Sequence, residues 1–268
     1  MNIYRGCSHG CIYCDSRSLC YRNADFDRIK VKEDALRVIR DDLRRKVKSG
    51  VIATGSMSDP YNPLEKELRL TRNALELINA YQFGVAIDTK STLVTRDAGI
   101  LLDIRKHSPV IVKLTITTSN DELSGKIEPN APCSTDRFAA IKTLSEQGIF
   151  CGVLTMPILP FINDTKENIV GIIERAKAAG ARFVFPAFGM TLREGNREYY
   201  YEKLDEIYPS LKEKYISRYG LRYSCTSPNA SSLWEVFKRE CENLSIIYSM
   251  RSIISQSRLG YEEQLSLF

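Results

Sequence analysis

Three cysteines lie close together near the start of the chain, in the stretch Cys7-Ser-His-Gly-Cys11-Ile-Tyr-Cys14. Their spacing suits one loop wrapped around one soft metal centre, because thiolates hold iron–sulfur clusters. A cubane cluster is a [4Fe–4S] unit, so three cysteines leave one iron without a protein ligand. That iron is open to a small molecule, which can coordinate it and accept an electron. The loop therefore predicts a redox centre with an open coordination position.

The position of this loop also constrains the fold. Residues 2–7 read as a short strand that runs into a glycine turn. The loop then follows the C-terminal end of a strand, which is where barrel enzymes place their chemistry. Because Met1 lies so close to Cys7, the first strand is short, and we expect that an N-terminal segment is missing from the sequence.

A zinc site is the main alternative for the cysteines, with Cys20 as a fourth ligand. A disulfide framework is disfavoured, because 8 cysteines in 268 residues are too few for a disulfide-stabilised scaffold. We favour the cluster. We also expect Cys20 to be structural, because a fourth protein ligand would fill the open iron.

Composition indicates a soluble globular protein with one large domain or one domain and an appendage, since 43% of the residues are hydrophobic and 26% are charged. No apolar run is long enough to span a membrane, and the N-terminus lacks a signal-peptide pattern. The cysteines therefore suit a reducing, oxygen-poor cytoplasm. The net charge of +5 permits an anionic partner without requiring one.

Apolar runs alternate with amphipathic helical patterns along most of the chain, and this predicts a parallel sheet with helices outside it. Six strand–helix units fall short of a closed barrel of about eight. We therefore predict an α/β fold: a partial (β/α)6 TIM-type barrel over 1–195, a C-terminal helical extension over 196–258, and a flexible tail over 259–268. The predicted strands are 2–7, 51–56, 83–89, 110–117, 149–156 and 182–188. The predicted helices are 33–48, 70–81, 97–106, 135–147, 166–179, 196–219 and 231–243.

Polar residues follow two of the predicted strands, at the ends that should face one central cavity. The second strand leads into a rigid polar turn that contains Ser56, Ser58 and Asp59. Lys90 and Ser91 follow the third strand and suit a carboxylate or a ribose. The plainer alternatives are an ordinary Asx/Pro turn and a surface lysine.

Two more candidates follow later strands. Arg137, near the start of a predicted helix, suits a carboxylate clamp. Asn163 lies in a proline-rich segment after the fifth strand, where extended backbone amides suit recognition of adenine.

The spacing CxxxCxxC resembles that of the radical S-adenosylmethionine (radical SAM) superfamily, whose core fold is also a partial barrel. The resemblance implies that Cys7, Cys11 and Cys14 hold a [4Fe–4S] cluster and that S-adenosylmethionine (SAM) binds at the open iron. It also implies that Tyr13 packs beside the adenine of SAM.

In that superfamily a Gly-Gly-Glu motif after the second strand holds the amino group of the methionine part of SAM. The polar turn with Ser56, Ser58 and Asp59 stands at this position here, and it departs from that motif. The candidate cofactor-binding residues are Tyr13, Ser56, Ser58, Asp59, Lys90, Ser91, Arg137 and Asn163.

A set of motifs over residues 2–195 resembles the spore photoproduct lyase-like, or DNA repair photolyase-like, branch of the superfamily. That lyase uses an extra cysteine near the second strand to return a hydrogen atom. No cysteine lies between Cys20 and Cys133 here, and we expect Cys151 and Cys225 to be buried apolar residues. The resemblance therefore does not imply the lyase reaction. The motifs are IYRGCxHGCxYC, SDPYxPxE, TKS, EPxAP and PIxPxxND.

The resemblance implies an enzyme that reductively cleaves SAM to a 5′-deoxyadenosyl radical, which abstracts hydrogen from a substrate. It also implies a reductant such as flavodoxin or ferredoxin. We expect a nucleic-acid substrate, DNA in particular. A peptide or small-molecule substrate, or a non-catalytic zinc or cluster module that recruits partners, stays open as an alternative.

The last residues, Gln264-Leu265-Ser-Leu267-Phe268, closely resemble the peptide with which bacterial proteins bind the sliding clamp. In this mode a leucine and a phenylalanine enter apolar pockets while the glutamine bonds at the rim. A chance match, or a tail packed on its own core, is the alternative. If the tail binds the clamp, it tethers the enzyme to DNA.

Overall fold

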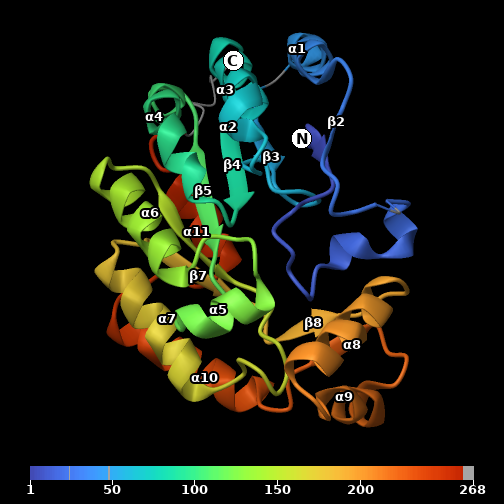
Figure 1. Cartoon of the computed structure of the whole chain (residues 1–268). Helices are drawn as coiled ribbons and strands as arrows, with labels where there is room; N and C mark the ends of the chain where they lie inside the picture. The colour runs from blue at the N-terminus through green and yellow to red at the C-terminus, as the bar shows by residue number, and fades with distance from the viewer. Residues whose placement is uncertain (24, 48, 262–268) are drawn as a thin grey trace.

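The computed structural model describes residues 1–23, 25–47 and 49–261. Its centre is a five-stranded parallel sheet in the order β3-β4-β5-β6-β7 (Figure 1). Strands that follow one another in the sequence are neighbours in the sheet, as expected for repeated strand–helix units. The strands are β3 (Val51–Thr54), β4 (Gly84–Thr89), β5 (Val110–Thr115), β6 (Cys151–Thr155) and β7 (Phe183–Pro186).

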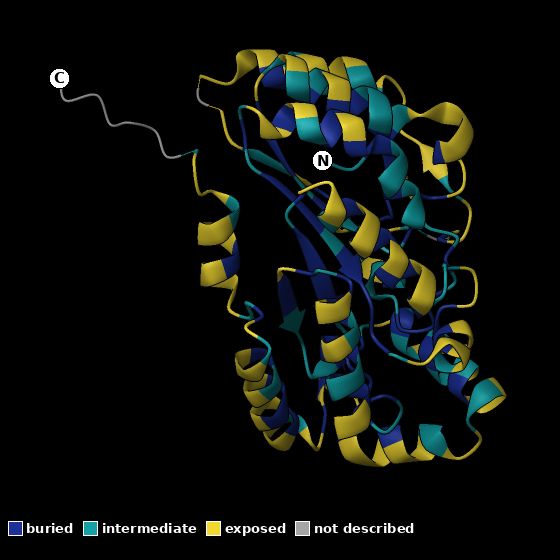
Figure 2. Cartoon of the chain, turned by 90° about the vertical axis from the view of Figure 1, so that its left-hand side faces the viewer, coloured by how far each residue is buried: buried dark blue, intermediate teal, exposed yellow. Residues whose placement is uncertain are grey.

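Helices cover the outer face of this sheet, one after each of its first four strands. The strands are rich in β-branched residues, and their outward side chains form a continuous core with the helices (Figure 2). Val85, Val112 and Val153 in this layer are fully buried. The covering helices are α3 (Leu70–Ala80), α4 (Ala98–Arg105), α6 (Ser134–Glu146) and α7 (Lys166–Ala178).

The inner face of the sheet is closed at the N-terminal ends of its strands by α11 (Met250–Ser257). Ile253 of this helix packs against Phe183 and Ile111. The C-terminal ends of the strands are not covered in this way. They carry the cavities described below.

The first predicted strand does not join the parallel sheet. Instead, β1 (Tyr4–Arg5) pairs antiparallel with β2 (Lys30–Val31). The chain turns at Gly6, which has a φ of +86°, and a Cβ on Gly6 would lie 2.5 Å from the carbonyl oxygen of Phe26. The described sheet thus holds five of the six predicted strands, and the α/β class is confirmed.

After β7 the chain forms a smaller layer. β8 (Gly189–Thr191) pairs antiparallel with β9 (Ser224–Thr226). The helix predicted over 196–219 is interrupted, because Ser210 has a φ of +74°. Since β8 and β9 lie on opposite sides of residue 195, the domain division there stays a prediction. The helices of this region are α8 (Asn196–Ile207), α9 (Leu211–Tyr219) and α10 (Ala230–Asn243), which packs on α7.

Shorter elements complete the described chain. The basic helix predicted over 33–48 is α1 (Ala35–Arg45), which buries Leu43. Within the part of the chain that the structure describes, no helix is both long and apolar enough to cross a membrane. The other elements are α2 (Glu65–Leu68), α5 (Asp121–Ile127), and the 3-10 turns η1 (Asp15–Arg17), η2 (Leu19–Tyr21) and η3 (Thr92–Asp97).

Candidate active site

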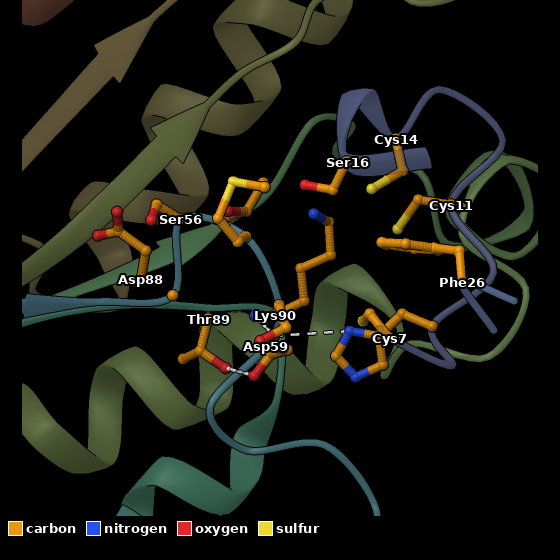
Figure 3. A pocket seen from close by; sticks show the side chains of 15 residues that line it. Cys7, Cys11, Cys14, Ser16, Phe26, Ser56, Asp59, Asp88, Thr89 and Lys90 are labelled. Carbon is orange, nitrogen blue, oxygen red and sulfur yellow. Dashed lines mark hydrogen bonds and ion pairs between the residues drawn. The ribbon is translucent and has the colours of Figure 1, made fainter. Parts of the chain in front are cut away.

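The three cysteines of the N-terminal loop line one cavity of about 140 Å³. Figure 3 shows Cys7, Cys11 and Cys14 along one side of this cavity, with Lys90 reaching in toward them. The opposite wall comes from the ends of β3, β4 and β5. Its other lining residues are His9, Ser16, Phe26, Gly55, Ser56, Met57, Ser58, Asp59, Asp88, Thr89 and Thr115.

Backbone hydrogen bonds from two distant segments hold the cysteine loop. The N–H of Cys7 donates to the carbonyl of Phe26 at 2.9 Å, and that of Ile12 donates to the carbonyl of Ile127 at 3.1 Å. The side-chain amide of Asn130 donates to the carbonyl of Ser8 at 3.0 Å. The backbone of the cysteine loop is therefore held from both sides.

The donor set fits an iron–sulfur cluster. Burial raises the pKa of the Cys7 thiol to about 11, and burial also raises the pKa of Cys14. A thiol ligand must lose its proton to bind metal, so binding here would release protons. Lys90 lowers the pKa of Cys14, which means that its positive charge favours the thiolate. Three thiols beside one cation suit a cluster with a net negative charge.

Lys90 is the one lysine or arginine among the described residues that line this cavity. Its ammonium lies 5.5 Å from the centre of the Tyr13 ring, and among the described residues it has no hydrogen bond or ion pair. Burial lowers the pKa of Lys90, but the charges of Cys11 and Glu128 raise it, and the net pKa lies above the usual value. The ammonium therefore faces the cavity fully charged and available to an anionic group.

Asp59 joins the turn after β3 to the end of β4. One carboxylate oxygen accepts hydrogen bonds from the Thr89 hydroxyl at 2.6 Å and the Tyr61 N–H at 2.9 Å. The other accepts from the Lys90 N–H at 2.8 Å and lies 3.5 Å from the Nδ1 atom of His9. Asp59 thus reaches the cavity wall, but its oxygens are occupied within the protein.

The two serines predicted beside Asp59 differ in their surroundings. The Ser58 hydroxyl donates to the carbonyl of Tyr4 at 2.8 Å, and the side chain is buried. Ser56 is exposed and lines the cavity. Ser91 caps the turn after β4, where its hydroxyl accepts from the N–H of Leu93. Of these serines, Ser56 is the one whose hydroxyl remains available to a ligand.

Arg137 and Asn163 line neither this cavity nor the larger one beside it, and their contact with the cofactor stays a prediction. Arg137 is fully buried, and its guanidinium lies 2.6 Å from the carboxylate of Glu128. The amide of Asn163 donates to the carbonyl of Thr117 at 2.8 Å and accepts from the N–H of Leu159. The polar atoms of both side chains thus contact other groups of the protein.

Glu128 connects this internal pair to the cavity. Its carboxylate accepts a hydrogen bond from the Tyr13 hydroxyl while it pairs with Arg137. The Tyr13 ring is thereby fixed beneath the Lys90 ammonium. In the sequence Glu128 stands out only as the first residue of the EPxAP motif, and its contacts with Tyr13 and Arg137 were not predicted.

A second cavity, of about 590 Å³, adjoins the thiol cavity, and Cys14, Ser16, Ser56 and Lys90 line both. Its far wall comes from the ends of β6 and β7 and from the β8–β9 pair. Asp15 lines it too, and the Thr191 hydroxyl donates to this carboxylate at 3.0 Å. The remaining lining residues are Tyr13, Met156, Pro157, Ala187, Phe188, Gly189, Met190, Ser224 and Thr226. The sequence did not predict the β8–β9 pair that forms part of this wall.

The structure does not bring the other cysteines to the site. Cys20 is exposed, and its sulfur accepts a hydrogen bond from Arg193 at 3.4 Å, so the zinc alternative with Cys20 as fourth ligand has no support. Cys151 and Cys225 are fully buried. Neither lines either cavity, so no further thiol of the described residues stands ready there to return a hydrogen atom.

Fold and site together define a class: a parallel α/β protein with a cluster-type cysteine loop at the strand ends. The family model described as "Radical SAM superfamily" matches residues 1–176. The chain belongs to the radical SAM superfamily. This confirms the predicted enzyme class and its cofactors, a [4Fe–4S] cluster and SAM, both of which occur in the similar solved structures.

Two relatives illustrate the range of the family. An uncharacterized protein of Mycobacterium tuberculosis is 31% identical over 226 residues, which cover 82% of this chain. The chain spans only 66% of the length of that relative. The radical SAM Nalpha-GlyT isomerase of Pseudomonas phage M6 is 27% identical over 185 residues, which are 68% of this chain and 37% of the isomerase.

Among solved structures, spore photoproduct lyase complexed with dinucleoside spore photoproduct is similar with a TM-score of 0.66. The match covers 92% of this chain and 75% of the lyase at 16% identity. At this identity the similarity concerns the fold. It confirms the predicted resemblance to the lyase-like branch at that level.

Proposed function

We propose that this protein abstracts a hydrogen atom from a nucleic-acid substrate, in a DNA-repair or DNA-modification reaction. When bound and reduced, the cluster supplies the electron that cleaves SAM to methionine and a 5′-deoxyadenosyl radical. The observation that carries the proposal is the wall shared by the two cavities. Because Ser56 and Lys90 line both cavities, a ligand anchored at the thiols extends directly into the larger one.

The residues around the cavities have distinct tasks in this proposal. Cys7, Cys11 and Cys14 hold the cluster through their thiolates. The Lys90 ammonium pairs with the carboxylate of SAM, and the Ser56 hydroxyl accepts from its amino group. The Tyr13 ring, fixed by Glu128, supports the adenosine part. The protein thus orients the cofactor and limits the access of water, while the cofactor carries the chemistry.

The nucleic-acid substrate is supported by three observations of different kinds. The similar lyase structure holds a dinucleoside photoproduct. The net charge of +5 favours an anionic partner. The 590 Å³ cavity offers an aromatic ring, Phe188, beside the hydroxyls of Thr191, Ser224 and Thr226. A ring and several hydroxyls suit a base stacked and hydrogen-bonded outside a duplex.

The test uses the anaerobically reconstituted protein, SAM and dithionite, with ultraviolet-damaged and undamaged oligonucleotides deuterated at thymine. Deuterium in the 5′-deoxyadenosine product is measured by mass spectrometry. We expect deuterium transfer from an oligonucleotide. Deuterium transfer only from peptides or small metabolites would contradict the nucleic-acid substrate. A protein that never cleaves SAM would contradict the proposed reaction itself.

The clamp-binding peptide, Gln264 to Phe268, lies outside the described residues. We propose from its sequence that it binds the sliding clamp and brings the enzyme to DNA in a reducing cytoplasm. Clamp affinity of the full chain is compared with that of a chain lacking residues 264–268. Equal affinities would remove the clamp as a partner and leave the enzyme proposal unaffected.

A further inference from the structure

A third cavity, of about 330 Å³, borders the thiol cavity. Ser16, Phe26 and Met57 line both of these cavities, so the two cavities adjoin at these residues. With the 590 Å³ cavity it has only Ser16 in common. The third cavity therefore adjoins the thiol cavity at these three residues, on a side away from most of the space left for SAM and substrate.

Positively charged side chains lie at the third cavity and on the segments beside it. Among the described residues, the lining of the third cavity includes two cations and no carboxylate. Three more exposed cations lie on the same short segments, because β1 pairs with β2 and the side chain of Arg5 donates to the carbonyl of Arg22. We call these five residues the basic rim: Arg5, Arg22, Arg28, Lys30 and Lys32.

The positive charge of the basic rim is not balanced by ion pairs within the described part of the chain. Among the described residues, none of its five side chains forms an ion pair, whereas exposed Arg37 and Lys106 each pair with an aspartate. Two carboxylates lie in the same segment, Asp25 and Asp27, and Asp27 is already paired with Arg17. A surface with several unpaired cations attracts an acidic partner and speeds its association.

We propose that the basic rim docks a small acidic electron-transfer protein that carries a flavin or an iron–sulfur centre. This inference rests on the proposed function, because a reductively cleaved cofactor needs an electron from outside. At this face the carrier loses one electron and the cluster gains it, and no bond or proton changes hands. The carrier can dock while SAM and substrate fill the second cavity.

Phe26 provides the contact between rim and thiols. Its ring lies in the wall of both cavities, and its carbonyl accepts the hydrogen bond from the Cys7 N–H at 2.9 Å. Figure 3 shows the Phe26 ring next to Cys7 and Cys11. An electron that enters at the rim thus meets a continuous path of covalent and hydrogen bonds to a cluster ligand.

The same cations would also attract phosphates, so nucleic acid is the competing occupant. The position of the rim favours the electron carrier. The substrate must reach the 590 Å³ cavity, whereas the rim borders the third cavity, which adjoins the thiol cavity at Ser16, Phe26 and Met57.

The test compares K30E/K32E with the control K238E/R251E in the reconstituted enzyme. All four lysines and arginines are exposed and lack ion pairs among the described residues, and both variants change the net charge equally. The control residues lie on α10 and α11, away from the rim. Stopped-flow absorbance follows cluster reduction by reduced flavodoxin at low and high salt. Binding of oxidised flavodoxin to the protein without cluster is measured by titration.

We expect K30E/K32E to slow reduction by flavodoxin at low salt by about tenfold or more and to weaken flavodoxin binding. SAM cleavage with dithionite should stay within about twofold of the parent for both variants. Unchanged flavodoxin reduction and binding would overturn the proposal, as would a loss confined to oligonucleotide binding. If the unsubstituted protein does not cleave SAM with dithionite, this result would instead contradict the proposed function.

Discussion

The carboxylate of Asp59 accepts a hydrogen bond of 2.8 Å from the backbone N–H of Lys90. This bond ties the turn after β3 to the first residue after β4, and the Thr89 hydroxyl adds a second tie at 2.6 Å. The backbone from which the Lys90 side chain enters the cavity is thereby held in place. Asp59, predicted from the sequence to bind the cofactor, lines the cavity and also positions the backbone of Lys90.

Replacing Asp59 by Ala should destabilise the protein, because the N–H groups of Tyr61 and Lys90 would lose their acceptor in a buried site. Hydrogen bonds to a charged group contribute about 1.5–3 kcal/mol each, so we expect a loss of about 3 kcal/mol in the free energy of unfolding. Urea denaturation followed by circular dichroism measures this. Asp42→Ala, at an exposed position with no ion pair to another described residue, is the control. Equal losses in the two variants would contradict the assigned role.

Replacing Lys90 by Met should weaken SAM binding without preventing cluster assembly. The side chain keeps an unbranched apolar stem, slightly shorter than that of lysine, but loses the charge that faces the cavity. A charge-assisted hydrogen bond in a partly buried site contributes about 1.5–3 kcal/mol, which corresponds to roughly a tenfold to hundredfold rise in Kd. Equilibrium dialysis with labelled SAM gives the Kd, and iron content checks the cluster. If SAM binds Lys90→Met as tightly as the parent, Lys90 does not contact the cofactor.

Replacing Cys11 by Ala should abolish the cluster, because Cys11 is buried in the middle of the anchored loop and supplies one of the three thiolates. The reconstituted variant should lose most of its iron and its absorbance near about 400 nm, which arises from thiolate-bound iron. Cys20→Ala should keep both, since Cys20 is exposed and bonded to Arg193. Equal iron loss in the two variants would indicate that Cys20 is a fourth metal ligand, as in the zinc alternative.

The sequence predicted the strands and helices of the sheet well because their signal is local. β-Branched runs and amphipathic spacings predicted β4, β5, α6 and α7 to within about two residues. The pairing of β1 with β2 was not predictable in this way, because it depends on which distant segment supplies the partner. The same limit hid the β8–β9 wall of the second cavity.

The site was predictable where one short stretch determines it. Cys7, Cys11 and Cys14 share a loop, so their convergence followed from spacing alone. Arg137 and Asn163 do not line the cavities, because a polar residue after a strand can face either the cavity or the chain. Their partners, Glu128 and the carbonyl of Thr117, decided the outcome. Position at a strand end is therefore weaker information than a cluster of ligands.

Gly55 marks a close approach of backbones beside the cavity, and its replacement tests that packing. Its φ is +99°, and a Cβ there would lie 1.9 Å from the carbonyl oxygen of Asp88. Gly55→Ala must therefore separate the ends of β3 and β4, and we expect a loss of at least about 2 kcal/mol, as for other strained or overpacked sites. Gly99→Ala, in α4 with open space around it, should be neutral or stabilising. Thermal unfolding of both variants distinguishes the two effects.

The buried pair of Glu128 and Arg137 predicts a pH-dependent stability. Burial raises the pKa of Glu128, but Arg137 and Lys90 lower it, and the net pKa in the native protein lies below its usual value. The pair therefore contributes stability that is present above about pH 4.3, the usual pKa of glutamate. This contribution is lost as the pH falls through the lower native pKa.

In Arg137→Met, burial acts on Glu128 without that cation, so the carboxyl prefers to stay protonated in the folded protein. The cost of the variant should then be smallest near about pH 4 and should grow toward neutral pH, where breaking a buried pair costs about 3–5 kcal/mol. Urea unfolding of parent and variant at several pH values measures the difference. The double variant E128Q/R137M, which buries no unpaired charge, should recover much of the loss at neutral pH. A difference that stays constant with pH would show that packing, and not the charge of Glu128, accounts for the effect.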